Sequence, residues 1–147
     1  MCTLKDLGDL AMKNKKVFID TDILIYAFDH QNEAKQKKAI ETLERFKDQL
    51  RISVQNLSEF TSVMLKYGCD PEWLRGTVSR MTRVMTVLPL KSSDVSEALR
   101  GVKQYHMHYW DAQIWAVARS NDIPVLFTED GPVGETIEGV TYVNPLA

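Results

Sequence analysis

Residues 15–29 read KKVFIDTDILIYAFD, an apolar stretch into which three aspartates are set. The run 17–19 combines β-branched and aromatic side chains without polar alternation, which is typical of a short strand buried on both faces of a parallel sheet. Asp20 and Asp22 follow this strand directly, although burial penalises a carboxylate that no partner compensates. The stretch therefore predicts a buried strand that leads into acids, and it raises the question of what compensates their charge.

Strand and helix patterns alternate along the remainder of the chain. Such alternation implies right-handed crossovers and a parallel α/β sheet. Short apolar runs predict further strands at 51–54, 125–127 and 140–143, and the run 87–90 could add another. The expected helices are a short one through Phe28 and longer ones over 32–50, 57–67, 74–88, 94–102 and 110–117.

The composition points to one domain of ordinary size. With 147 residues, of which 44% are hydrophobic, the chain can bury a single core. Its apolar runs are shorter than a membrane span and lack the flanks of a signal peptide, so we expect a soluble, cytoplasmic protein with no membrane partner. The cysteines Cys2 and Cys69 are too few and too distant to predict a disulfide framework or a zinc site.

The formal net charge of −2 argues against a wholly basic nucleic-acid-binding protein. A site for a polyanion would therefore have to be a local patch around an acidic centre. For any one lysine, a solvated helix face is the commoner explanation. Two such clusters are present, at Lys35, Lys37 and Lys38 and at Arg75, Arg80 and Arg83.

Acidic residues follow several of the expected strands. In open parallel sheets, sites form beyond the carboxyl ends of the strands, where the crossovers diverge. Four segments that are distant in the sequence could therefore deliver acids to one pocket. The acids are Asp20 and Asp22 after the first strand, Glu59 in the helix after the second, Asp111 near a helix start, and Glu129 and Asp130 after the strand 125–127.

A divalent cation would resolve the conflict between such acids. Carboxylates within a few ångströms of one another raise each other's pKa and resist joint ionisation. Oxygen ligands without a convincing Cys/His set favour a hard ion, Mg²⁺ or Mn²⁺, over zinc. Such ions can bind a phosphodiester oxygen and activate water, so the pattern indicates metal-dependent phosphodiester hydrolysis.

Four motifs in this order carry a more specific signal than any short motif alone. They are FIDTDILIYAFD at 18–29, NLSEF at 56–60, YWDAQIWAVA at 109–118 and LFTEDG at 126–131. Together they resemble the PIN-domain ribonucleases, especially the VapC-type toxins of toxin–antitoxin pairs. The resemblance spans roughly residues 16–145, so residues 15–147 are expected to form a PIN-like nuclease domain, and residues 1–14 are left as an unassigned extension.

The resemblance implies a fold, a site and partners. The fold is a three-layer α/β/α arrangement with a central parallel sheet of four to five short strands. The partners are an RNA substrate, a small protein antitoxin and a second copy of the chain in a homodimer. In the site, Thr21 and Thr128 would orient the acids or contact phosphate, and Mg²⁺ or Mn²⁺ would be held by Asp20, Glu59, Asp111 and Asp130.

Two acids leave alternatives open. Where the family most often has Asn after Asp-Thr, this chain has Asp22, which either adds charge beside the metal or points into a hydrogen-bond network. Glu129 could compete with Asp130 as a ligand. The aromatic residues Tyr26, Trp110 and Trp115 are expected in the core rather than as platforms for RNA bases.

Rival functions come from other classes. Asp-x-Asp after an apolar strand also opens the aspartate-nucleophile phosphatases, but Ile23 and Leu24 follow here instead of Gly-Thr. A catalytically silent binding module would not need all four acids. A housekeeping nuclease with the same fold would differ from a toxin in lacking an antitoxin partner.

Overall fold

A computed structural model describes residues 3–8 and 12–147 of the chain. The N-terminal extension, which the sequence left unassigned, contains a short helix at Leu4–Leu7. The elements are α1 (Leu4–Leu7), β1 (Val17–Ile19), α3 (Thr21–Tyr26), α4 (Glu33–Arg45), β2 (Leu50–Ser53), α5 (Val54–Lys66), α6 (Pro71–Val84), β3 (Thr86–Leu88), α7 (Ser92–Tyr105), α8 (Tyr109–Ser120), β4 (Val125–Phe127), β5 (Thr136–Ile137) and β6 (Val140–Val143).

The strands form one six-stranded sheet in the order β3-β2-β1-β4-β6-β5. Neighbouring strands are parallel except for β5, which pairs antiparallel with β6. The predicted α/β class and parallel sheet are confirmed. Five strands are parallel, in agreement with the predicted four to five, and the additional antiparallel β5 has only two residues, which is too short for a periodic pattern.

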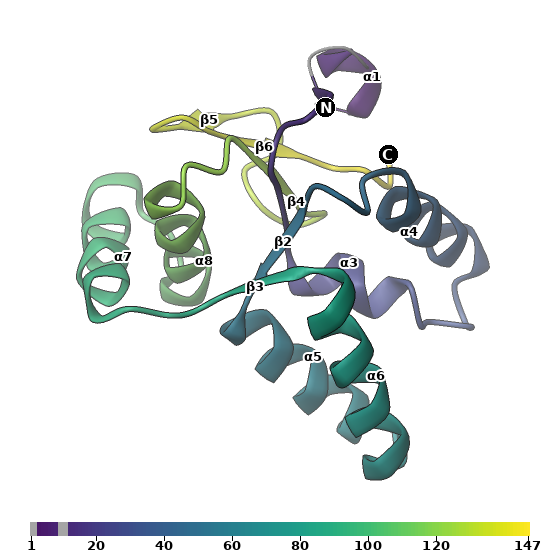
Figure 1. Ribbon diagram of the computed structural model, residues 1–147. Helices are drawn as coiled ribbons and strands as arrows, with labels where there is room; N and C mark the ends of the chain where they lie inside the picture. Colours follow the sequence, from purple (N-terminus) through teal and green to yellow (C-terminus); the bar gives the residue numbers. More distant parts are fainter. Residues whose placement is uncertain (1–2, 9–11) are drawn as a thin grey trace.

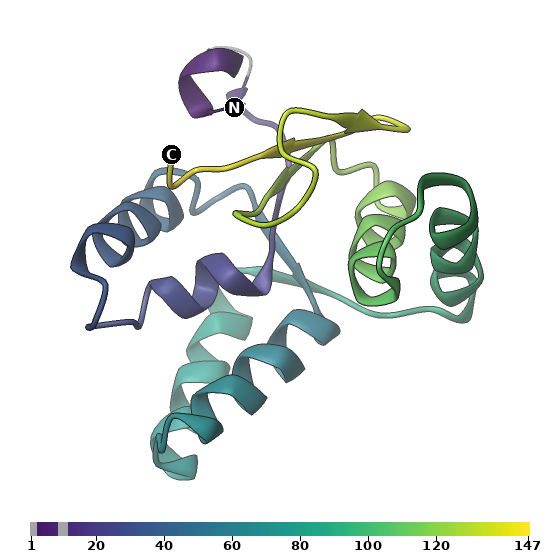
Figure 2. The same ribbon diagram turned by 180° about the vertical axis from the view of Figure 1, so that it is seen from behind.

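Helices cover both faces of the sheet, as the three-layer prediction required. In Figures 1 and 2, α7 and α8 lie on one side and the pairs α3–α4 and α5–α6 lie on the other. The central strand β1 serves both layers because its side chains alternate. Val17 and Ile19 pack with the core of the α3–α6 side, and Phe18 packs with the core of the α7–α8 side.

Two helices end earlier than their apolar spacing predicted. The helix expected over 32–50 ends at Arg45, and Leu50 is the first residue of β2. The helix expected over 74–88 ends at Val84, and Leu88 belongs to β3. In both cases an apolar residue of the next strand, the buried Leu50 or the half-buried Leu88, fell at helical spacing, so periodicity alone extended the helix too far.

No helix in the described part of the chain is both long enough and apolar enough to cross a membrane.

Close packing between α7 and α8 allows a stability prediction. A Cβ atom on Gly101 of α7 would lie 3.0–3.1 Å from the Trp115 ring and from Sδ of Met107. We therefore expect Gly101→Ala to lower the free energy of unfolding by about 1–3 kcal/mol through overpacking. The matched control is Gly76→Ala in α6, where nothing lies within 4 Å and helix propensity should add about 0.5–1 kcal/mol. Urea unfolding of both variants measures the difference, and equal stabilities would contradict it.

Candidate active site

Segments distant in the sequence bring acids to the carboxyl edge of the central strands. The parallel register pairs Ile19 with Phe127, and the N–H of Asp20 donates to the carbonyl of Phe127 at 3.0 Å. The residues that follow β1 and β4 are therefore neighbours. α5 follows β2, the other neighbour of β1, and α8 begins at this edge because it runs back toward the start of β4. We call Asp20, Asp22, Glu59, Asp111, Glu129 and Asp130 the acidic edge.

Asp20 and Asp22 share the hydroxyl group of Thr128. Its Oγ1 lies 3.0 Å from Oδ2 of Asp20 and 3.3 Å from Oδ2 of Asp22, so its one proton can serve only one of them at a time. The backbone N–H of Thr21 donates to Asp20 at 2.7 Å, and that of Glu129 donates to Asp22 at 2.9 Å. All these donors are uncharged, so they hold the carboxylates without neutralising them.

The surroundings raise the pKa of both aspartates. Burial and repulsion from Asp22 raise the pKa of Asp20 from 3.8 to about 7. Burial and repulsion from Asp130 raise the pKa of Asp22 to about 6, despite the hydrogen bond from the Glu129 N–H. The two alternatives for Asp22 are therefore not exclusive, because it joins a hydrogen-bond network and also adds charge beside Asp20.

Glu59 reaches the edge from α5, with both carboxylate oxygens engaged. The hydroxyl of Thr21 donates to Oε2 at 2.8 Å, and the side-chain amide of Gln55 donates to Oε1 at 2.6 Å. The two threonines thus serve different acids, since Thr21 donates to Glu59 and Thr128 to Asp20. Each hydroxyl restrains a carboxylate from a distant part of the sequence.

Asp111 and Asp130 complete the edge from its exposed side. Burial raises the pKa of Asp111 and nearby His108 lowers it, while repulsion from Glu59 and Asp130 raises it further, so the net shift is upward. Interactions of this kind weaken with distance. They therefore place Asp111 in the same electrostatic environment as Glu59 and Asp130.

Glu129 is neutralised by residues outside the edge. Its carboxylate lies 2.6 Å from Nζ of Lys35 in α4 and accepts a hydrogen bond of 2.6 Å from the hydroxyl of Tyr26. Burial alone would raise the pKa of Glu129, but these two partners lower it below its ordinary value. Of the acidic pair after β4, only Asp130 lacks such a basic partner among the ion pairs of the described residues.

The acids have the chemistry of a hard-cation site but not its finished geometry. Their donors are oxygens only, and their mutual repulsion is what a divalent cation relieves. Within residues 3–8 and 12–147, however, no three Asp, Glu, His or Cys side chains are close enough to hold a metal ion. An ion would therefore have to draw the side chains of the acidic edge together.

The sequence did not identify three side-chain amides that lie near Glu59. Gln55, Asn56 and Gln113 are buried and hydrogen-bonded around Glu59. The spacing of four between Gln55 and Glu59, on one face of a helix, was the signal that could have found the first of them. Gln113 belongs to another helix, and no local pattern connects it with Glu59.

Trp110 corrects a prediction. It was expected in the core but is 54% exposed, whereas Trp115 is fully buried as predicted. The Trp110 ring packs edge-on against Tyr109, with centroids 5.2 Å apart, directly beside Asp111. An exposed aromatic ring next to the acidic edge offers a surface on which a nucleotide base could stack.

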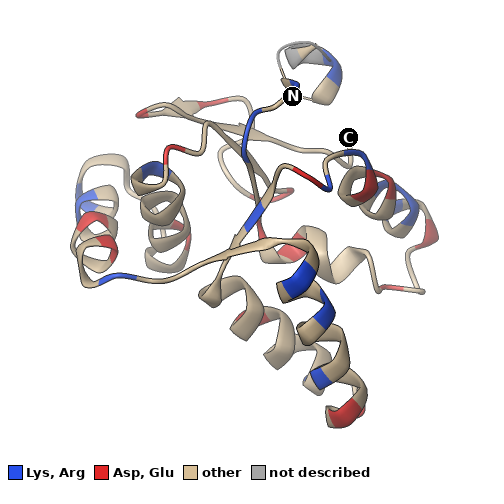
Figure 3. Ribbon diagram, viewed as in Figure 1, with Lys and Arg blue, Asp and Glu red and all other residues tan. Residues whose placement is uncertain are grey.

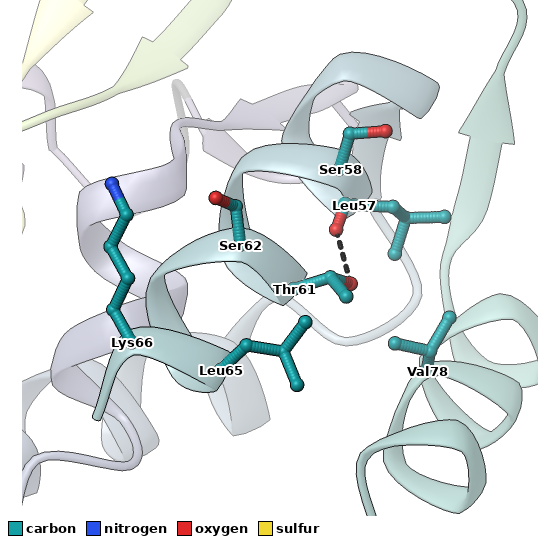
Figure 4. Close-up of a pocket in the computed structure, with 7 residues that line it drawn as sticks. All are labelled: Leu57, Ser58, Thr61, Ser62, Leu65, Lys66 and Val78. Atoms are coloured by element: carbon teal, nitrogen blue, oxygen red, sulfur yellow. Dashed lines mark hydrogen bonds between the residues drawn. The ribbon is translucent and has the colours of Figure 1, made fainter. Parts of the chain in front are cut away.

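An apolar groove of about 730 Å³ lies between α5 and α6 (Figure 4). It contains no acid, and the hydroxyl of Thr61 is bonded to the carbonyl of Leu57 at 2.7 Å. Its chemistry is therefore that of a contact surface rather than a reaction centre. The lining residues are Leu57, Ser58, Thr61, Ser62, Leu65, Lys66 and Val78.

The fold and the acidic edge define an α/β protein with its candidate site beyond the carboxyl ends of parallel strands. The family model of the PIN domain matches residues 17–132. The chain belongs to the PIN-domain family. No curated protein sequence gives a significant match.

Solved structures share this fold. A toxin–antitoxin complex from Klebsiella pneumoniae is similar with a TM-score of 0.69 and 23% identity, over 88% of this chain and 98% of that one. VapC20 of Mycobacterium tuberculosis, a toxin that cleaves the sarcin–ricin loop, gives 0.65 and 17%, over 84% and 98%. VapBC2 from Rickettsia felis, bound to a promoter DNA fragment, gives 0.64 and 15%, over 87% and 97%.

Proposed function

We propose that residues 15–147 form a metal-dependent endoribonuclease that hydrolyses RNA phosphodiester bonds. The observation that carries the proposal is the pair Asp20 and Asp22, whose pKa values are raised to about 7 and about 6 at the carboxyl edge of the sheet. A structural pair of buried acids would gain from neutralisation by a basic side chain, as Glu129 does. Here the donors are uncharged, which suits a site that receives a cation.

The ion would be Mg²⁺ or Mn²⁺, held by Asp20, Glu59, Asp111 and Asp130. When bound, such an ion neutralises phosphate charge and activates water for attack on phosphorus. The chain's own residues would orient the ligands, with Thr21 donating to Glu59 and Thr128 donating to Asp20. Glu129 would take no ligand role because its charge is already paired with Lys35.

RNA is the substrate that the surroundings favour. Basic residues lie along α4 and α6 (Figure 3), which flank the α3–α5 pair that carries Asp20 and Glu59. Lys37 and Lys38 of α4 and Arg75, Arg80 and Arg83 of α6 are exposed. We propose that these residues contact the phosphates of a bound polyanion on the helices beside the site, and that Trp110 provides a stacking surface.

The biological role we propose is that of a VapC-like toxin that is restrained by a small protein antitoxin. Three similar structures are a toxin–antitoxin complex, a sarcin–ricin loop cleaving toxin and a VapBC pair on promoter DNA, which supports this role over that of a housekeeping nuclease. The apolar groove between α5 and α6 is a surface on which a partner's apolar side chains could pack.

We also propose a homodimer, to which α6 would contribute only the apolar residues that its own core leaves exposed. The apolar stripe formed by Leu74 and Met81 of α6 and by Met85, which caps the helix, is buried within the chain's own core. Trp73 and Val84 remain exposed, at 44% and 67%. A second copy would therefore have to contact these flanking residues rather than the stripe itself.

The rival functions explain less of the site. A phosphatase would use Asp20 as a nucleophile, but Ile23 and Leu24 follow Asp22 where the phosphatase motif has Gly-Thr. A silent binding module would have no use for carboxylates whose pKa values are raised by crowding. Trapping of a phosphoaspartate analogue at Asp20 would revive the phosphatase.

The test of the proposed function is cleavage of RNA by the purified chain with added Mg²⁺ or Mn²⁺, with and without EDTA. We expect cleavage that depends on the ion and stops when the chelator is in excess. Ion replacement after chelation should restore it, which serves as the control for damage by EDTA. Cleavage that continues unchanged in EDTA would contradict metal-dependent hydrolysis.

A further inference from the structure

Buried side-chain amides surround Glu59, and together they connect it to the first turn of α8. Gln55, Asn56 and Gln113 are 9%, 0% and 4% exposed. A buried amide that loses a partner costs about 1–3 kcal/mol, so each contact constrains the orientation of the next. We infer that these three amides are positioning residues that fix the Glu59 carboxylate against the helix carrying Asp111; the inference rests on the proposed function.

The first chain of hydrogen bonds has Gln55 at its centre. Nε2 of Gln55 donates to Oε1 of Glu59 at 2.6 Å and to the backbone carbonyl of Trp110 at 3.2 Å. Oε1 of Gln55 accepts from Nε2 of Gln113. Oε1 of Gln113 in turn accepts from the hydroxyl of Tyr109 at 3.0 Å. The chain therefore runs from Tyr109 through two amides to Glu59.

A backbone group sets the direction of this chain. A carbonyl oxygen only accepts, so the amino end of Gln55 has to face Trp110, and the same end then faces Glu59. Reversal of the amide would place its oxygen against both the carbonyl and the carboxylate. The Trp110 carbonyl therefore fixes the orientation of the Gln55 amide, whose oxygen then faces Gln113. Gln113 must in turn present its amino end to that oxygen.

A second chain reaches the other oxygen of Glu59 and is anchored in the same way. The backbone N–H of Ser53 donates to Oδ1 of Asn56 at 2.8 Å, so the amino end of Asn56 faces Thr21. Nδ2 of Asn56 donates to Oγ1 of Thr21 at 3.1 Å. The Thr21 hydroxyl is thereby left to donate its proton to Oε2 of Glu59, at 2.8 Å.

The two series of hydrogen bonds both end at the Glu59 carboxylate, which they reach from different elements. One is anchored at Trp110, the residue before Asp111 in α8, and the other at Ser53, where β2 meets α5. Glu59 is thus fixed in orientation, and the start of α8 is held at a set distance from it. The arrangement positions two acids from separate helices relative to one another.

The test is Gln55→Met, which removes all three contacts of the Gln55 amide, to Glu59, Trp110 and Gln113, while retaining a side chain of similar length. We expect Mn²⁺ affinity, measured by calorimetry, and kcat for RNA cleavage each to fall by about 10–100-fold, with KM for RNA within about twofold of the wild type. Gln113→Met should give a smaller loss because Gln55 keeps its bond to Glu59. The matched control is Gln104→Met, an exposed glutamine of α7 that bonds Arg100.

A double-mutant cycle separates positioning from a merely structural role. In a Glu59→Gln background, Gln55→Met should cause no further loss of Mn²⁺ affinity, since its effect acts through Glu59. Additive losses, or wild-type affinity in both Gln55→Met and Gln113→Met, would overturn the inference while leaving the proposed function intact. Should Gln55→Met not fold, wild-type affinity in Gln113→Met alone would overturn it. Wild-type protein that neither binds Mn²⁺ nor cleaves RNA would remove both.

Discussion

Replacement of Asp20 by asparagine is expected to lower the rate of RNA cleavage by about 10³-fold. The variant loses a ligand charge at the centre of the acidic edge, where a metal ion contributes several kcal/mol of stabilisation and each 1.4 kcal/mol is about a factor of ten. Asparagine can still accept through its one oxygen, from either the Thr128 hydroxyl or the Thr21 N–H, so the fold should persist. Single-turnover cleavage of labelled RNA in Mg²⁺ measures the effect.

The same substitution should stabilise the metal-free protein at about pH 8. Asp20 has a pKa of about 7 in the folded chain and 3.8 as its ordinary value, so its charge opposes folding at this pH. Asp20→Asn removes that charge and should raise the melting temperature in EDTA. Asp48→Asn, at an exposed position outside the acidic edge, is the matched control for both measurements. Cleavage by Asp20→Asn at the wild-type rate would show that the assigned centre is wrong.

Opposite pH trends are expected with and without metal. The raised pKa values mean that Asp20 and Asp22 take up protons on folding between about pH 4 and pH 7, so the metal-free protein should lose stability as pH rises through this window. Ligation requires the charged carboxylates, so Mg²⁺ affinity should instead rise with pH up to about 7 and release protons on binding.

Melting temperatures at about pH 5 and about pH 8, in EDTA and in Mg²⁺, measure both trends. We expect the stabilisation by Mg²⁺ to be large at the higher pH and small at the lower one. Asp22→Asn, which installs the residue common in the family, should reduce the repulsion on Asp20 and weaken the pH dependence in EDTA. If Mg²⁺ raised the melting temperature by the same amount at both pH values, Asp20 and Asp22 would not be the groups that cause the pH dependence.

The class of fold could be predicted because its signals are local. The run 17–19 is apolar on both faces, and the structure buries it completely at the centre of the sheet. Gly68 follows α5 with a φ of 83°, a conformation that glycine adopts most easily, so the residue that ends this helix is also a local signal. The predicted helix ends were wrong where tertiary contacts determine the structure. Leu50 is an example, because its pairing with β1 and its burial outweigh the helical spacing.

The site was predictable as a set of acids but not as an arrangement. Asp20 and Asp130 could be named because they follow strands, and Glu59 and Asp111 because each lies early in a helix expected near the same edge. The pairing of Glu129 with Lys35 could not be read from the chain, because α4 reaches β4 only through the tertiary fold. The same holds for the contact between Gln55 and Gln113, which are 58 residues apart.

The ends of the sheet limit how other chains can associate with this one. Its outermost strands, β3 and β5, have three and two residues, which is too short for a foreign strand to continue the ladder of hydrogen bonds. Strand addition and edge-to-edge aggregation are thereby disfavoured. We therefore expect another protein to recognise this one mainly through its helices and loops, where side-chain complementarity rather than backbone pairing determines the partner.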